Sequence, residues 1–362
     1  MRSPRLFRVV ALLIGLVLGV ALIIVRAAIT AYVDTPRRQL VRFDGDWLMQ
    51  PDDEIGFVAP KHARTTFLPP NDVPAFHIFT NAVGGRVTEP TASAAIPRPD
   101  VVVVGCSFSW GFGMENERTF ASRLQRDLGV EVENLAFPGY GTVQAGLTLQ
   151  RHAALRPRLV IYPFIGDHIR RNLLPCGPSV APFCLPVPYV AFDRAQRASL
   201  RPPATNLFPP LLTRQYVTEM LLDRRFTTRT VLWTLTTDYL RAKEFLMLGH
   251  PNDTDDMGAR TAGVAFSMSK LAETTRQLGA RLLVVWIPGL EREQTDAAQR
   301  ELTASLPADA TFLDMSPVVK RYYEDPTRPL LRFDRDIHPN EHGHALMATE
   351  IARVIRERDL VR

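Results

Sequence analysis

Residues 101–113 have the sequence VVVVGCSFSWGFG, and this stretch decides the fold expected for the chain. Four consecutive valines are typical of a strand that is buried on both faces, as strands of parallel sheets are. The small residues after the valines let the backbone turn sharply and present the side chain of Ser107 at the edge of the sheet. The stretch therefore predicts a central parallel strand with a serine at its carboxyl end.

Apolar runs and helical patterns alternate along the chain beyond this strand. Further strands are expected around residues 130–135, 159–162, 282–286 and 311–313, and helices over 120–128, 143–154, 265–278 and 341–356. Strands that alternate with helices predict a parallel sheet covered on both faces. We expect a three-layer, doubly wound, flavodoxin-like α/β fold, in which ligands bind at the carboxyl ends of the strands.

The chain of 362 residues is expected to have three regions. Residues 1–33 are expected to form a membrane anchor, and residues 34–100 an irregular extension that packs on the core. Residues 101–362 are expected to form the main α/β domain. An insertion at about 170–263 contains Pro-rich loops and helical pieces, and we interpret it as a lid or side lobe rather than an independent domain.

The expected anchor is the uninterrupted apolar run from residue 9 to residue 25. At 1.5 Å per helical residue the run extends about 26 Å, near the lower limit for crossing a bilayer. Arg2, Arg5 and Arg8 precede it and favour a cytoplasmic N-terminus with an exported body. We expect a single-pass cell-membrane protein with a periplasmic or extracellular domain; a cleaved signal peptide is the alternative.

The net charge of +5 comes from scattered arginines, and no nucleic-acid-binding module accompanies them, so nucleic acid is not an expected partner. Cys176 and Cys184 lie in a short loop, CGPSVAPFC. In an exported protein a disulfide between them is expected, with two unpaired thiols as the alternative. Cys106 is expected to be a small buried residue.

Polar residues near the C-terminus form the motif DRDIHPNEHGH at residues 334–344. A carboxylate two residues before a histidine, as Asp336 is before His338, can hold the imidazole in one tautomer. A metal site built from His338, His342 and His344 with Asp334 or Asp336 is the alternative. The proline at residue 339 prevents the first two histidines from sharing a regular helix face, so we expect no metal and no cofactor.

Taken with NLAFPGYGT at residues 134–142 and GDH at 166–168, these blocks resemble the SGNH/GDSL hydrolase superfamily. That family has a serine after the first strand, a glycine after the second, an asparagine after the third, and Asp and His near the C-terminus. Residues 134–142 and 80–86 are similar to its membrane-anchored bacterial branch. The resemblance implies Ser107 as nucleophile, His338 as base and Asp336 as its orienting acid, with Asp334 in reserve. The N–H groups of Ser107 and Gly139 would form the oxyanion hole.

Two positions depart from the family pattern. Cys106 replaces the aspartate before the serine, and Asp167 stands where the family has an asparagine. An ionised carboxylate accepts hydrogen bonds and donates none, so Asp167 would be a poor third wall of the oxyanion hole. Either His168 donates instead, or Asp167 is protonated, or the two backbone donors act alone.

The resemblance implies a serine-dependent ester hydrolase that acts on an acylated carbohydrate or lipid of the cell envelope, and we favour an acetylated carbohydrate. The alternatives are an O-acyltransferase with the same triad and a non-catalytic glycan-binding protein. Trp110, Tyr140 and His168 are candidate substrate-binding residues, since each follows a predicted strand. Packing at the sheet edge is the other interpretation of the two aromatic residues.

Overall fold

A computed structural model gives the structure of the protein. It describes residues 12–24, 42–46, 48, 50–69, 73–89, 96–175, 187–193, 195–203, 256–290 and 297–361. The predicted disulfide cysteines, Cys176 and Cys184, lie outside the described residues, as does most of the predicted insertion. Cys106 is described, and it is a buried free thiol.

The core is a five-stranded parallel sheet with the order β13-β12-β9-β7-β8. Its strands are β7 (Val101–Val103), β8 (Val132–Asn134), β9 (Leu159–Phe164), β12 (Arg281–Trp286) and β13 (Thr311–Asp314). Counted along the core, this order is 2-1-3-4-5, which is the flavodoxin-like arrangement. The predicted α/β class and parallel sheet are confirmed.

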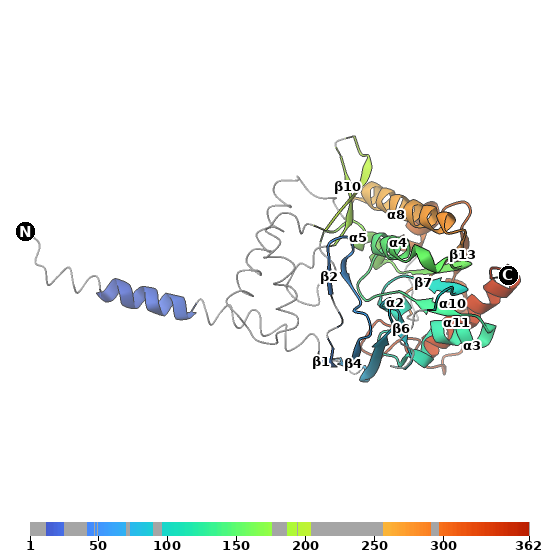
Figure 1. Cartoon of the computed structure of the whole chain (residues 1–362), viewed down its shortest axis with the longest axis horizontal. Helices are drawn as coiled ribbons and strands as arrows, with labels where there is room; N and C mark the ends of the chain where they lie inside the picture. The colour runs from blue at the N-terminus through green and yellow to red at the C-terminus, as the bar shows by residue number, and fades with distance from the viewer. Residues whose placement is uncertain are drawn as a thin grey trace, which may run out of the picture.

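Helices cover both faces of this sheet, and Figure 1 shows the resulting three layers. One face carries α3 (Phe120–Leu128), α10 (Ser316–Tyr322) and α11 (Glu341–Glu357), and the other α4 (Thr142–Arg151), α5 (Asp167–Arg171), α8 (Met257–Gln277) and α9 (Ala297–Ala304). Alternate residues of β7 face opposite helix layers. Val101 and Val103 pack with α3 and α11, whereas Val102 packs with α4 and α8. Burial on both faces explains the unbroken valine run.

The predicted helices are present, with shifted ends. The helix expected over 143–154 is divided into α4 and a 3₁₀ turn, η2 (Ala153–Leu155). Helix α8 begins at Met257 rather than at the expected residue 265, and the Asp256 side chain caps it by accepting from Gly258 N. Asn340 caps α11, accepting from the amides of His342 and Gly343.

The segment before the core forms two small antiparallel sheets. One contains β1 (Arg42–Gly45), β4 (Arg64–Leu68), β5 (Phe76–Thr80) and β6 (Arg86–Val87), and the other β2 (Gln50–Asp52) and β3 (Gly56–Val58). Their apolar side chains form one cluster with Trp110, Phe137 and Tyr140 of the core domain. This cluster attaches the segment to the loops at the carboxyl ends of β7 and β8.

Two further regions bear on the sequence predictions. Residues 12–24 are helical, and no helix in the described part of the chain is both long and apolar enough to span a membrane. The rest of the predicted anchor lies outside the described ranges. Of the predicted insertion, the hairpin β10 (Tyr189–Phe192) and β11 (Ala198–Arg201) is described. The predicted domain boundaries stay predictions.

Candidate active site

Ser107 is the first residue of a short helix, α2 (Ser107–Trp110), at the carboxyl end of β7. The turn into this helix is tight, because the amides of Ser109 and Trp110 both donate to the Cys106 carbonyl. Gly105 has a φ of +137°, and a Cβ at this position would lie 2.5 Å from Ser109 Oγ. Only glycine fits such a turn. The turn leaves Ser107 6% exposed.

The structure brings Ser107, His338 and Asp336 together in one hydrogen-bonded row. Ser107 Oγ lies 2.7 Å from His338 Nε2, and His338 Nδ1 lies 2.5 Å from Asp336 Oδ1. With Nδ1–H donating to the carboxylate, Nε2 is free to accept the hydroxyl proton of the serine. Such a row can convert the serine hydroxyl into a nucleophile. The acid held in reserve, Asp334, is exposed.

The loop that carries His338 is held by contacts among neighbouring residues. Phe333 N donates to the His338 carbonyl at 3.2 Å. Asn340 caps α11 with its Oδ1, and its Nδ2 donates to the carbonyls of Leu330 and Arg332, both at 2.8 Å. The Phe112 ring packs on the imidazole of His338, with centroids 4.3 Å apart. These contacts fix the imidazole in position beside the serine.

The other two histidines of the motif lie in different surroundings. His344 is fully buried and its Nδ1 accepts from Phe120 N at 3.2 Å, whereas His342 is exposed. Burial, with nearby cationic groups, lowers the pKa of His344 to about 3, so this residue is neutral. Among the described residues, no group of three or more His, Cys, Asp or Glu side chains could hold a metal ion.

The loop after β8 carries Gly139, the predicted second oxyanion donor. Gly139 is half-buried and has a φ of +88°, a conformation that favours glycine. Asn134 joins this loop to the serine turn, because its Nδ2 donates to the Ser109 carbonyl at 3.1 Å and its Oδ1 accepts from Ala136 N. Phe137 N also donates to the Gly105 carbonyl. The role of Gly139 stays a prediction.

Helix α5 differs from what the sequence predicted. The Asp167 side chain is 63% exposed and its carboxylate forms an ion pair with Arg171 at 3.1 Å, so it provides no hydrogen-bond donor. His168 is fully buried, with Nδ1 2.8 Å from the Tyr162 hydroxyl. Burial lowers the pKa of His168 well below its usual value. This burial argues against the substrate-binding role and against the alternative that His168 donates to the oxyanion, and both stay predictions.

Trp110 and Tyr140 also face the core rather than a ligand. Trp110 is 2% exposed and packs against the buried Arg86, whose guanidinium carbon lies 4.5 Å from the ring centroid. Tyr140 is likewise buried and donates its hydroxyl to the Phe57 carbonyl at 2.7 Å. Their predicted role in substrate binding is replaced by packing of the N-terminal segment on the core.

Arg86 is a residue whose role the sequence did not predict. Its Nη1 donates to the carbonyls of Trp110 and Gly111, and its Nη2 donates to the carbonyl of Met114. Arg86 therefore holds the segment that follows the serine helix. Burial lowers the pKa of its guanidinium to about 9, partly opposed by Glu115 and Glu117. The sequence showed only an arginine after Gly85, and the carbonyl groups that Arg86 binds could not be inferred from it.

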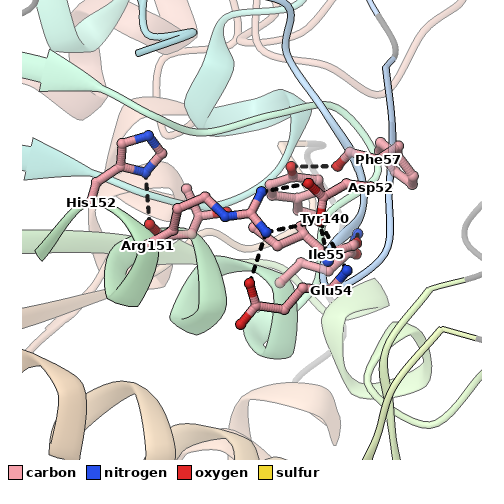
Figure 2. Close-up of polar contacts among 9 residues, drawn as sticks. Asp52, Glu54, Ile55, Phe57, Tyr140, Arg151 and His152 are labelled. Atoms are coloured by element: carbon pink, nitrogen blue, oxygen red, sulfur yellow. Dashed lines mark hydrogen bonds and ion pairs between the residues drawn. The ribbon is translucent and has the colours of Figure 1, made fainter.

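A cavity of about 350 Å³ lies between the β2–β3 hairpin, α4 and the loop after β8. Figure 2 shows the polar contacts beside it, where Arg151 of α4 forms ion pairs with Asp52 and Glu54 while Tyr140 contacts Phe57. Burial opposes ionisation of Asp52, but bonds from Arg151 and two backbone amides leave its pKa below the usual value. The cations and carboxylates beside this cavity therefore largely satisfy one another.

Comparison with known proteins gives similarity to solved structures alone: no protein-family model and no curated protein matches the chain. TesA is 12% identical, with 71% of this chain and 98% of that chain covered and a TM-score of 0.38. A lipolytic protein of the G-D-S-L family from Desulfitobacterium hafniense is 13% identical, with coverages of 70% and 98% and a TM-score of 0.34. An acetyl-xylooligosaccharide esterase from Geobacillus is 10% identical, with coverages of 70% and 92% and a TM-score of 0.35.

Proposed function

We propose that the protein is a serine-dependent ester hydrolase of the SGNH type. The observation that carries the proposal is the hydrogen-bonded row of Ser107, His338 and Asp336, with Ser107 Oγ 2.7 Å from His338 Nε2. A serine hydroxyl is a weak nucleophile unless a base lies within hydrogen-bonding distance and is itself oriented by a third group. Ser107 meets both conditions, because His338 Nε2 lies within hydrogen-bonding distance of its Oγ and Asp336 contacts His338 Nδ1.

In the proposed reaction, Ser107 Oγ attacks the ester carbonyl while His338 Nε2 takes the hydroxyl proton. Negative charge develops on the carbonyl oxygen, where the amides of Ser107 and Gly139 would donate to it. His338 then gives the proton to the leaving alcohol, and an acyl group remains on Ser107. Water, activated by the same imidazole, releases the acid in the second half of the reaction. Asp336 stabilises the imidazolium that forms in each half.

The proposed substrate is a small acyl ester on a carbohydrate or lipid of the cell envelope. An acetylated carbohydrate is the first substrate to try, and the Geobacillus protein named above is an acetyl-xylooligosaccharide esterase. The proposed location is outside the cytoplasm, as expected from the arginines that precede the apolar run at residues 9–25. Substrate and location belong to the proposal.

The experiment compares Ser107→Ala and His338→Ala with the wild-type chain in turnover of a chromogenic acetyl ester. Both variants should lose activity by a factor on the order of 10⁴ or more, because each removes a member of the nucleophile–base pair. Ser109→Ala is the matched serine control from the same turn, because its buried Oγ has no hydrogen-bond partner among the described residues. His342→Ala is the matched histidine control, since His342 is exposed in the first turn of α11.

Labelling by a fluorophosphonate probe gives a measurement that does not depend on the correct substrate. The wild-type chain and both controls should be labelled, and Ser107→Ala should not. Wild-type turnover in Ser107→Ala would contradict the proposal. A wild-type chain that is folded but not labelled would contradict it too, and would favour a binding protein. Labelling without ester turnover would direct the search to acyl transfer onto a glycan acceptor.

A further inference from the structure

A guanidinium group contacts the loop after β8 although the proposed reaction assigns it no role. Arg171 is the last residue of α5, and its charged side chain is 15% exposed. Its Nη1 donates to the Tyr140 carbonyl at 3.2 Å, and its Nη2 donates to Asp167 Oδ2 at 3.1 Å. Tyr140 directly follows Gly139, so one end of the guanidinium is held by the loop that carries the predicted oxyanion donor.

The charge of the same side chain also acts on the residue that precedes the nucleophile. Burial raises the pKa of the Cys106 thiol, and the charge and hydrogen bond of Arg171, together with the Ser107 side chain, partly offset that effect. Arg171 is therefore close to the residue that directly precedes the nucleophile. Its hydrogen bond with the Tyr140 carbonyl places it next to Gly139, whose amide is expected, with that of Ser107, to bind the developing oxyanion.

The chemistry of the site requires positive charge or hydrogen-bond donors at this point. Asp167, at the position where the resemblance predicts an amide, is an acceptor and forms an ion pair with Arg171. A guanidinium presents five N–H donors, more than the contacts with Tyr140, Asp167 and Cys106 engage. Positive charge in a partly buried site also acts on a nearby oxyanion more strongly than it would in water.

We propose that Arg171 is the third stabilising group of the oxyanion site and that Asp167 is a positioning residue that holds Arg171 in place. This inference rests on the proposed esterase function, because it assigns a donor to the same reaction. Arg171 donates hydrogen bonds to the oxyanion as negative charge develops and takes no proton from any group. A helix that lacks the expected amide thereby supplies a cation instead.

The test measures kcat and KM of full-length variants on the chromogenic acetyl ester, with melting temperature as the check on folding. Arg171→Met should lower kcat about 100-fold while KM changes little, as for loss of one oxyanion donor. Arg171→Lys keeps the charge and should retain kcat within about tenfold of wild type. Arg170→Met is the matched control, because Arg170 is the exposed neighbour on the same helix, and its kcat should equal that of wild type.

Asp167→Asn separates the proposal from the simplest alternative, that Asp167 itself faces the oxyanion and weakens the site. In that case, restoring the amide would raise kcat. Under the proposal kcat stays the same or falls, because Arg171 loses its anionic partner. An increase in kcat in Asp167→Asn would therefore overturn the proposal. So would a rise in KM with unchanged kcat in Arg171→Met, which would make Arg171 a substrate anchor.

The outcomes also separate this inference from the proposed function. If Ser107→Ala is inactive but Arg171→Met keeps the wild-type kcat, the inference fails and the esterase proposal stands. If Ser107→Ala keeps wild-type activity, the esterase proposal itself fails. Should Arg171→Met melt well below the wild-type chain, Arg171→Ala assayed with and without guanidinium chloride replaces it. Recovery of kcat with guanidinium, and not with sodium chloride at equal ionic strength, supports the inference; absence of recovery overturns it.

Discussion

The loop at residues 330–340 and helix α5 both carry polar residues that the sequence assigned to one site, but they are held in different ways. The loop is fixed by hydrogen bonds among its own residues, such as Phe333 N to the His338 carbonyl and Asn340 Nδ2 to the Leu330 carbonyl. Helix α5 is held by residues of other elements, Tyr140 of the loop after β8 and Tyr162 of β9. When the residues of a motif form hydrogen bonds with one another, the sequence of the motif predicts its geometry. When residues of other elements hold the motif, its sequence does not.

The first test of this comparison replaces Asp336, the acid of the loop. Asp336→Asn should lower kcat on the order of 10⁴-fold, because the amide can donate to Nδ1 and hold the imidazole in the wrong tautomer. Asp334→Asn is the matched control and should keep the wild-type kcat, since Asp334 is exposed. The measurement is kcat on the chromogenic ester. A larger loss in Asp334→Asn than in Asp336→Asn would contradict the assignment of the acid.

Removing the residue that closes the loop should have a smaller effect. Asn340→Ala removes the cap of α11 and the donors to Leu330 and Arg332. We expect a loss of stability of about 1–2 kcal/mol from the cap. We also expect kcat to fall by up to about 100-fold, because His338 moves relative to Ser107.

Asn340→Asp separates the two effects in the loop, since a carboxylate still accepts from the amides of α11 but cannot donate to Leu330 and Arg332. Urea unfolding and kcat should therefore diverge, with stability closer to wild type and kcat still reduced. Equal recovery of both would show that the cap alone matters. In that case the Nδ2 donors would not position His338.

A substitution among the residues that hold α5 should lower the free energy of unfolding more than it lowers kcat. The Tyr162 hydroxyl lies 2.8 Å from both Thr142 Oγ1 and His168 Nδ1. Tyr162→Phe leaves these buried groups without that partner and should cost about 1–3 kcal/mol of unfolding free energy, with kcat close to wild type. Tyr322→Phe, on the partly exposed surface of α10, is the control and should cost less. If kcat of Tyr162→Phe fell as much as that of Asn340→Ala, the difference proposed between α5 and the loop would be wrong.

The sequence predicted the sheet well because its signals are local. Unbroken valines define β7, and the spacing of Phe120, Leu124 and Leu128 with Gly129 after them defines α3, whose C-cap has a φ of +64°. The start of α8 was wrong because Gly258 and Gly263 weaken the helical pattern there. Gly263 packs so closely on Leu173 that a Cβ would lie 2.5 Å from it. Tertiary packing, invisible in the sequence, stabilises that first part of the helix.

The candidate site was predictable to a similar extent. Ser107, Asp336 and His338 come together because a strand end and a helix start fix them, and both features have sequence signals. The partners of Arg86 and Arg171 are backbone carbonyls and side chains that folding brings near, so the type of residue gave no indication of its role. The choice between substrate binding and packing was left open for Trp110 and Tyr140 for a related reason, since the segment that buries them precedes the core in the chain.

Helix α5 and α11, the helix that follows the loop, each contain a buried histidine. His344 of α11 and His168 of α5 are both fully buried, and burial lowers the pKa of each, to about 3 for His344 and well below the usual value for His168. In the unfolded chain their pKa is near 6.5. As pH falls below 6.5 the unfolded chain binds protons that the folded chain does not, so stability decreases. Each histidine should contribute about 1 kcal/mol of this loss per pH unit.

Urea unfolding at pH 7, 6 and 5 tests this linkage. His344→Asn keeps an acceptor for Phe120 N and removes the titrating group, so its unfolding free energy should fall less between pH 6 and pH 5, by about 1 kcal/mol. His342→Asn is the control, because His342 is exposed and the slope should match that of wild type. His168→Asn should flatten the slope in the same way from the α5 side, although the two helices are held differently. If neither buried variant changes the slope, these histidines are protonated in the folded protein, and the neutral, packed rings assigned to both helices are wrong.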